Sequence, residues 1–308
     1  MEIKGGRPSH SLIICSRNRP DSLLATLQIV LQQEKTVQLS EIILVLNLSD
    51  DAQFSSLLNK VDDLPYKYFK IMRTEGGLPS ARNKAVLQIA NTDITHFIDD
   101  DVTIGSNYFI QVENLLSQNL NISGGAPIDL IALDKSTKIK LSRIKHYLGM
   151  IPEPGRISKS MRNYWGPVSN NVCVEVDWLP GLAMFFRTKI LRDNLFYEKL
   201  ETFKLGGYGL GEDLIFTLGL TVKGHKLYGV PSLEVHHVQL PNITTVSKKV
   251  AYTQGQLKRE LVSLFPERFS RTKYLLSLLL EGFLVSVKFP NEIQNNFRNC
   301  FEEIRGFW

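Results

Sequence analysis

Residues 11–47 read SLIICSRNRPDSLLATLQIVLQQEKTVQLSEIILVLN, which is a short apolar run, a helix-length segment and a second apolar run. The runs at 11–16 and 41–47 are rich in Ile, Leu and Val and predict buried strands, and residues 21–33 between them predict a helix. A strand, a crossover helix and a second strand form the unit from which parallel sheets are built. This stretch therefore predicts an α/β fold with a mostly parallel sheet.

The same alternation continues along the chain. YKYFKIM at 66–72 and THFIDDD at 95–101 predict further strands, and SARNKAVLQIA at 80–90 predicts a helix between them. In open sheets of this kind, ligands bind at the carboxyl ends of the strands. We therefore expect the polar residues that end the predicted strands to meet at one edge of the sheet: Ser16, Arg17, Asn47, Asp99, Asp100 and Asp101.

The second half of the chain is less regular. Residues 141–170 are rich in Pro, Gly and basic residues and predict a long irregular loop. DLIFTLGLTVKG at 213–224 predicts a helix, and SLEVHHV at 232–238 predicts a strand. The composition then becomes helical and basic, so we expect one large domain over residues 1–240 and a mainly helical extension over 241–308.

Composition indicates an ordinary globular chain. The 308 residues are 43% hydrophobic and 22% charged, with 21 Gly and 13 Pro, which excludes collagen, a coiled coil and wholesale disorder. No run reaches the ~18 apolar residues of a spanning helix, and the first ten residues lack an apolar signal region, so we expect a cytoplasmic chain. Cys15, Cys173 and Cys300 have no metal-site or disulfide-framework spacing, and buried thiols are expected.

The basic character belongs to the C-terminal region. Residues 241–308 contain ten Lys or Arg and six Glu, a net charge of +4 out of +5 for the chain. Such a region can meet phosphates, an anionic membrane surface or an acidic partner, and no nucleic-acid-binding motif accompanies it. Within it, 11 of the 16 residues at 274–289 are apolar or Tyr. They predict a helix that either packs on the large domain or lies on the inner face of a membrane.

The aspartates at 99–101 are the first candidate site. No G-x-G-x-x-G follows the first predicted strand and no P-loop occurs, so a bound nucleotide would need a divalent cation to balance its phosphates. Asp99 and Asp101 are two apart on an extended chain and point the same way, while Asp100 would turn toward ribose or backbone donors. With 14 Asp in the chain the spacing also arises by chance, and a solvated acidic turn explains it equally well.

Several motifs in a fixed order favour a cation site over a solvated turn at these aspartates. They are IICSRNRP at 13–20, RTEGGLPSARNKA at 73–85 before THFIDDD, VDWLPGLAMFFR at 176–187, LFYEKL at 195–200 and GGYGLGED at 206–213. Together, over residues 10 to about 238, they resemble the family-two nucleotide-sugar glycosyltransferases of the GT-A fold. The resemblance implies a nucleotide-binding half at about 10–105, an acceptor half at about 106–240, and inverting, metal-dependent transfer from a UDP, dTDP or GDP sugar to a saccharide or lipid-linked acceptor.

The resemblance also implies roles for single residues. The positions expected near the nucleotide or nucleotide sugar are Ser16, Arg17, Arg19, Asn47, Arg82, Asn83, Asp99 and Asp100. Asp99 and Asp101 become the D-x-D pair that holds Mn²⁺ or Mg²⁺. Asn47 departs from the family, which usually has an acidic residue there. An amide oxygen still accepts a hydrogen bond from a base N–H, so nucleotide binding is expected without a preference for uridine.

Six further positions complete the expected site. Asp213 is implied as the general base and Glu212 as a contact to the acceptor. The helix dipole alone also stabilises acidic residues in the first turn of a helix, which is the alternative explanation for this pair. Adjacent histidines point to opposite faces of a strand, so either His236 or His237 could complete the metal site, and His237 fits the family pattern better. Trp178 and Gly181 are implied to line the sugar and acceptor pocket, although core packing explains a Trp beside AMFF equally well.

Two other functions compete with transfer. A sugar-nucleotide nucleotidyltransferase should have a Gly-rich, Lys-containing loop after the first strand, where SRNRP stands. A non-catalytic glycan- or nucleotide-binding module of the same fold predicts loss of catalytic groups, and both carboxylate pairs are present. We therefore expect an enzyme of surface polysaccharide or glycoconjugate synthesis.

Overall fold

The chain is described from a computed structural model. The structure describes residues 7–33, 37–47, 51–64, 68–129, 153–168, 171–202, 211–238, 248–288 and 293–308. The predicted loop at 141–170 is described from 153 to 168 only, and most of the glycine-rich segment at 206–211 lies outside the described residues.

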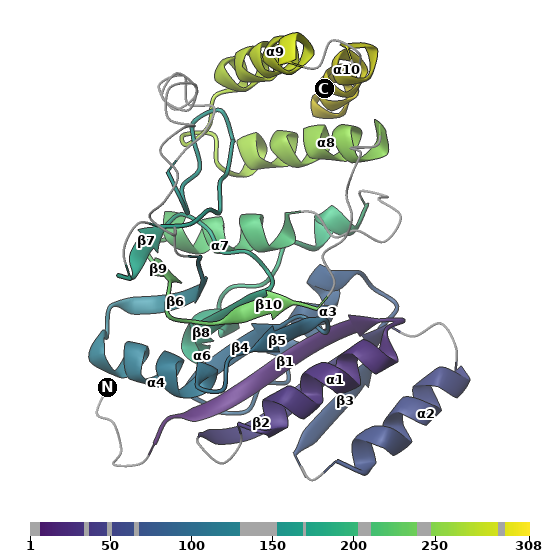
Figure 1. The fold of residues 1–308 in the computed structure, drawn as a ribbon, viewed down its shortest axis with the longest axis vertical. Coiled ribbons are helices and arrows are strands. Elements are labelled where there is room, and N and C mark those ends of the chain that lie inside the picture. Colours follow the sequence, from purple (N-terminus) through teal and green to yellow (C-terminus); the bar gives the residue numbers. More distant parts are fainter. Residues whose placement is uncertain are drawn as a thin grey trace.

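An eight-stranded sheet forms the centre of the molecule (Figure 1). Its spatial order is β3 (Phe69–Arg73), β2 (Gln38–Asn47), β1 (Ser9–Arg17), β4 (Ile94–Ile98), β8 (Ala183–Arg187), β6 (Ile122–Pro127), β9 (Lys226–Val230) and β7 (Val174–Val176). Neighbouring strands are parallel from β3 to β4 and between β6 and β9. β8 runs antiparallel to β4 and β6, and β7 runs antiparallel to β9. The predicted mostly parallel sheet is confirmed.

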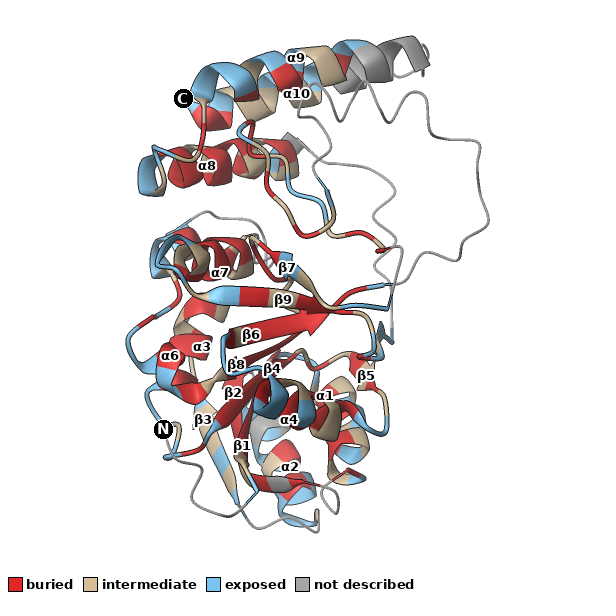
Figure 2. Ribbon diagram, turned by 90° about the vertical axis from the view of Figure 1, so that its left-hand side faces the viewer, coloured by how far each residue is buried: buried red, intermediate tan, exposed pale blue. Residues whose placement is uncertain are grey.

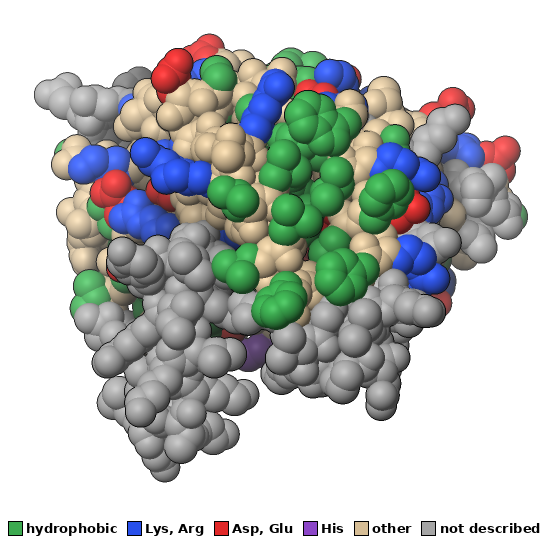
Figure 3. Space-filling view, turned by 90° about the horizontal axis from the view of Figure 1, so that it is seen from above, with side chains coloured by type: hydrophobic (Ala, Val, Ile, Leu, Met, Phe, Trp, Pro, Cys, Tyr) green, Lys and Arg blue, Asp and Glu red, His purple; other side chains and the backbone are tan. Residues whose placement is uncertain are grey.

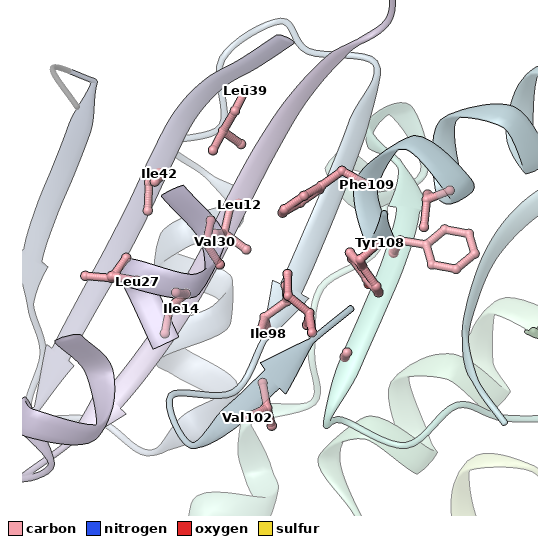
Figure 4. Packing of buried hydrophobic residues seen from close by; sticks show 14 of the residues in the cluster. Leu12, Ile14, Leu27, Val30, Leu39, Ile42, Ile98, Val102, Tyr108 and Phe109 are labelled. Atoms are coloured by element: carbon pink, nitrogen blue, oxygen red, sulfur yellow. The ribbon is translucent and has the colours of Figure 1, made fainter. Parts of the chain in front are cut away.

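Alternate residues of the strands supply two apolar layers. Leu12 and Ile14 of β1 face a core with α1 (Pro20–Leu31), α2 (Asp51–Asp62) and α4 (Tyr108–Gln118), part of which Figure 4 shows. Ile13 faces the opposite side, where it joins α3 (Leu78–Val86), α6 (Thr188–Arg192) and α7 (Glu212–Val222). Figure 2 shows α1, α2 and α4 on one side of the sheet and α3 and α6 on the other. The period of two along each strand therefore places helices on both faces.

A third apolar core joins the C-terminal helices to the sheet domain. α7 contributes Leu214 and Leu218, and α8 (Lys248–Leu264) packs on it through Leu257. α9 (Arg271–Lys288) and α10 (Ile293–Phe307) lie beyond α8, at the top of Figure 1. α8 and α10 approach closely, since a Cβ on Gly306 would lie 1.9 Å from the Tyr252 carbonyl oxygen. Among the helices that the structure describes, none combines the length and the apolar character needed to cross a bilayer.

Two local expectations differ from the structure, and one helix lies in a segment for which no element was expected. That helix is α2, formed by the polar residues 51–62, in which Leu57 and Val61, four residues apart, anchor one face on the core. The predicted strand at 232–238 is shorter, with only Val235–His237 (β10) paired. The three cysteines are free as expected, but each is partly exposed where full burial was predicted.

Candidate active site

The three aspartates lie in the link between β4 and the short strand β5 (Val102–Ile104). Asp100 is fully buried, and its Oδ2 accepts a hydrogen bond from the Ser16 hydroxyl at 2.5 Å. Arg19 forms ion pairs with both Asp100 and Asp101. β1 and β4 are parallel neighbours, which brings the residues after β1 beside those after β4. Asp100 thus faces a side-chain hydroxyl and a guanidinium.

His237 lies beside Asp101 because of strand pairing. β10 pairs antiparallel with β5, with His237 opposite Val102, and the Val238 N–H donates to the Asp101 carbonyl at 2.9 Å. This register leaves Nδ1 of His237 3.7 Å from Oδ1 of Asp101. His236 is opposite Thr103 in the same ladder, and adjacent strand residues point to opposite faces. Of the two histidines, His237 is therefore the one beside the aspartates.

Arg82 of α3 joins the two carboxylate pairs. Its guanidinium is buried, with Nη2 3.4 Å from Oδ1 of Asp99 and Nη1 3.4 Å from Oε1 of Glu212. Nη2 also donates to the Gly181 carbonyl at 3.3 Å. Burial raises the pKa of Asp99 to about 7 and that of Glu212 to about 7, and the positive charge of Arg82 opposes both shifts. Residues from three distant segments thus share one buried cation.

Asp213 is held by backbone groups at the start of α7. Its Oδ2 accepts the Gly181 N–H at 2.7 Å and its Oδ1 accepts the Leu214 N–H at 2.7 Å. Burial raises the pKa of Asp213, with Arg82 and these backbone hydrogen bonds acting in the opposite direction. A Cβ on Gly181 would lie 3.1 Å from Nη2 of Arg82, so a larger residue there would require the Arg82 guanidinium to move by a few tenths of an ångström. The carboxylate is therefore fixed in position and partly desolvated.

Two residues expected to contact ligands make contacts within the protein. The Asn83 amide donates to the Phe196 carbonyl at 3.0 Å and to Glu198 at 2.7 Å, and its oxygen accepts the Phe196 N–H at 2.7 Å. Trp178 is buried in the C-terminal core, with its ring 5.5 Å from that of Trp165. The resemblance alone could not distinguish these contacts from ligand contacts.

Arg17 and Asn47 end β1 and β2 side by side. They are register partners in the parallel ladder, and the Asn47 amide donates to the Gly76 carbonyl at 2.9 Å. Arg17 is exposed. Both lie at the sheet edge where ligands were expected, although Asn47 also supports the turn before α3.

Sequence reasoning missed two supporting residues. Glu201 accepts hydrogen bonds from the backbone N–H, at 2.7 Å, and from the hydroxyl of Ser80, in the first turn of the helix that carries Arg82. Thr217 accepts the Leu179 N–H at 3.0 Å and donates to the Asp213 carbonyl at 2.6 Å, which ties the chain before Gly181 to α7. Glu201 and Ser80 are 121 positions apart, so no local pattern indicates their contact.

The described side chains offer two donors for a divalent cation, Asp101 and His237. No group of three or more His, Cys, Asp or Glu within the described ranges is arranged to hold a metal ion. Mg²⁺ and Mn²⁺ in nucleotide sites are usually bound by one or two protein ligands together with substrate phosphates. Asp101 and His237, whose Oδ1 and Nδ1 lie 3.7 Å apart, fit such a partial site, although the other oxygen of Asp101 pairs with Arg19.

Comparison with known proteins adds independent findings. Residues 11–156 match the family model described as glycosyl transferase family 2. The fold is similar to that of GalNAc-T7 solved with UDP, GalNAc and Mn²⁺, with a TM-score of 0.61 and 16% identity over 84% of this chain and 48% of that one. It is also similar to the mannosyltransferase PcManGT from Pyrobaculum calidifontis, solved with GDP-Man and Mn²⁺. The TM-score is 0.59, with 12% identity over 99% of this chain and 88% of that one. The chain spans about half the length of the GalNAc-T7 chain. No curated protein sequence matches.

Proposed function

Since the chain carries the glycosyl transferase family 2 match over residues 11–156 and has the GT-A type of fold, we propose that it is a metal-dependent inverting glycosyltransferase. The substrate would be a nucleotide-diphosphate sugar and the acceptor a hydroxyl group of a saccharide or lipid-linked glycan. The observation that carries the proposal is that Arg82 contacts one member of each carboxylate pair, Asp99 and Glu212, because this contact brings the neighbours of the proposed metal ligand and of the proposed base into one cluster. We assign catalysis to residues 1–240.

The donor side is proposed to use the residues at the ends of β1, β4 and β10. Asp101 and His237 would hold Mn²⁺ or Mg²⁺, which supplies positive charge to the leaving diphosphate when bound. Ser16 and Arg19 orient Asp100 and Asp101, and Asn47 lies at the edge where a nucleotide base would bind. The similar structures were solved with UDP, GalNAc and Mn²⁺ and with GDP-Man and Mn²⁺, which supports a donor of this class.

The acceptor side is proposed to centre on Asp213. Its carboxylate takes the proton of the acceptor hydroxyl while that oxygen forms a bond to the anomeric carbon and the bond from this carbon to the diphosphate oxygen breaks. Each carboxylate oxygen keeps a lone pair beyond its backbone hydrogen bond, so the group can still accept this proton. The raised pKa of Asp213 strengthens it as a base. A single attack of this kind needs no enzyme nucleophile and inverts the anomeric centre.

Nucleotide binding is the first test. Thermal unfolding would be followed with UDP, GDP, dTDP and CMP, each with and without Mn²⁺, for the wild type, Asp101→Ala and the control Asp62→Ala, whose side chain is exposed on α2. A ligand at about 100 times its Kd stabilises a protein by ~2.7 kcal/mol. We expect a Mn²⁺-dependent shift with one nucleotide in the wild type and the control, and none in Asp101→Ala. If no nucleotide shifts the wild type, the proposal fails.

Asp213→Asn tests the base. This variant keeps the shape of the side chain but not its proton affinity, so it should retain the nucleotide-dependent thermal shift. Release of nucleoside diphosphate from the matching nucleotide sugar, in the presence of an accepted glycan, should fall by at least ~10²-fold. A normal kcat in Asp213→Asn would contradict the assignment of Asp213.

A further inference from the structure

The C-terminal helices carry an exposed apolar patch. It consists of Leu276, Leu279 and Phe283 on α9, Phe297 and Phe301 on α10, and Trp308, which are 62%, 53%, 59%, 49%, 64% and 70% exposed. Figure 3, seen from the α9 and α10 end, shows apolar side chains gathered in one continuous area. Contiguous apolar area of this kind on a soluble surface usually marks an interaction site.

Packing among the described residues does not account for the patch. Positions 276, 279 and 283 lie on one face of α9, while Tyr274 and Leu278 on another face are buried in the C-terminal core. The same separation occurs on α10, where Phe297 and Phe301 are exposed and Phe307 is buried. Each helix therefore has an inner apolar face that stabilises the fold and an additional outer one.

The charges around the patch are mainly positive. Arg271, Lys273 and Arg298 are exposed on the same two helices, and Figure 3 shows Lys and Arg side chains, with fewer Asp and Glu side chains, around the apolar area. The acidic residues there have partners: Glu281 binds Arg162, Glu302 binds Arg305, and Glu303 accepts from the Tyr274 hydroxyl at 2.7 Å. The surface thus combines aromatic and aliphatic side chains with a basic border.

We propose that this face docks on an anionic lipid bilayer. Trp, Phe and Leu side chains enter the boundary between headgroups and acyl chains, and Lys and Arg side chains meet lipid phosphates, as in interfacial amphipathic helices. A second copy of the chain is a poorer partner, because symmetric contact through this face would bring the two basic borders together. The inference goes beyond the proposed function and uses none of its residues.

Docking leaves the candidate active site accessible. α8 lies between the patch helices and α7, whose first turn holds Glu212 and Asp213 (Figure 1). Nucleotide binding by the full chain should therefore be the same with and without vesicles. This also makes the two proposals separable, because vesicle binding requires no donor, metal or acceptor.

Vesicle co-sedimentation of the full chain tests the proposal. The probes are phosphatidylcholine vesicles with and without one-quarter phosphatidylglycerol, at low and high NaCl. The variant is Phe283→Glu with Phe301→Glu. The matched control is Leu87→Glu with Leu120→Glu, which adds the same charge at residues that are 69% and 74% exposed far from the patch. Thermal unfolding of each protein, which needs no ligand, checks that it folds.

We expect the wild type and the control to bind phosphatidylglycerol vesicles, with affinity falling as salt rises. The patch variant should bind at least ~10-fold more weakly, since each aromatic side chain contributes about that factor when buried. Equal binding by the patch variant and the control overturns the proposal. A second result also overturns the proposal. In it, the wild type is a dimer in analytical ultracentrifugation, the patch variant is a monomer, and neither protein binds vesicles.

Discussion

Acid should destabilise the protein through a buried histidine pair. His10 of β1 and His96 of β4 are fully buried, with Nδ1 of His10 3.0 Å from Nε2 of His96 and the rings stacked at 5.2 Å. Phe109 of α4 packs edge-on against both rings. Burial lowers the pKa of His10 from 6.5 to about 4, with the charge of Asp93 acting in the opposite direction. Burial, together with repulsion from His10, also lowers the pKa of His96.

The magnitude follows from the shift at His10. The folded state binds this proton more weakly than the unfolded chain, so the contribution to stability is complete above pH 6.5 and is lost as the pH falls toward 4. With these two pKa values the loss is about 1.4 kcal/mol at pH 5.5 and about 2.6 kcal/mol at pH 4.5. His96 adds to the loss in the same direction. Glu113 also lies beside His10, with Oε2 3.5 Å from Nε2.

Urea unfolding at pH 8, 5.5 and 4.5 measures the effect, with His10→Leu/His96→Leu as the reference. Replacing both partners of a buried hydrogen bond by apolar groups of similar shape can be nearly neutral. Asp99 and Glu212, whose raised pKa values add stability as the pH falls, are present in both proteins, so their effect cancels in the difference. The wild type should lose at least about 2.6 kcal/mol relative to the variant by pH 4.5. A difference that does not change with pH would refute the reasoning.

Two further substitutions separate structural from ligand contacts. Asn83→Ala removes both hydrogen bonds to the Phe196 backbone, so the free energy of unfolding in urea should fall by ~1–3 kcal/mol. The nucleotide-dependent thermal shift should be retained. Loss of that shift at unchanged stability would instead assign Asn83 to the nucleotide. Arg82→Met leaves Asp99 and Glu212 without their shared cation and should destabilise by ~3 kcal/mol in the same assay, with Arg82→Lys recovering only part, because two different guanidinium nitrogens make the contacts. Equal stability of Arg82→Met and wild type would show that the cluster does not need this cation.

Much of the fold is encoded locally. Leu12, Ile13 and Ile14 alternate between the two cores, and apolar runs of this kind with helix-length segments between them suffice to predict the sheet and its parallel strands. α2 escaped prediction because two apolar contacts leave little periodic signal in a polar segment. The sequence also predicted that the side chains following β1 and β4 meet, because parallel neighbouring strands end at the same edge of a sheet. Ser16 does contact Asp100 there.

The sequence by itself determined the layers, the edge at which polar residues gather and the types of group available for catalysis. Only the tertiary structure decided which of them meet. Arg82 contacts Glu212 across 130 positions, and the register of β10 on β5, not the pair of adjacent histidines, places His237 beside Asp101. Asn83 and Trp178 have residue types that suit a ligand site, and the packing of distant segments gives both of them contacts within the protein. The physical reason is that periodicity and turn chemistry act over a few residues, whereas a buried charge takes whichever partner the folded chain brings within hydrogen-bonding distance.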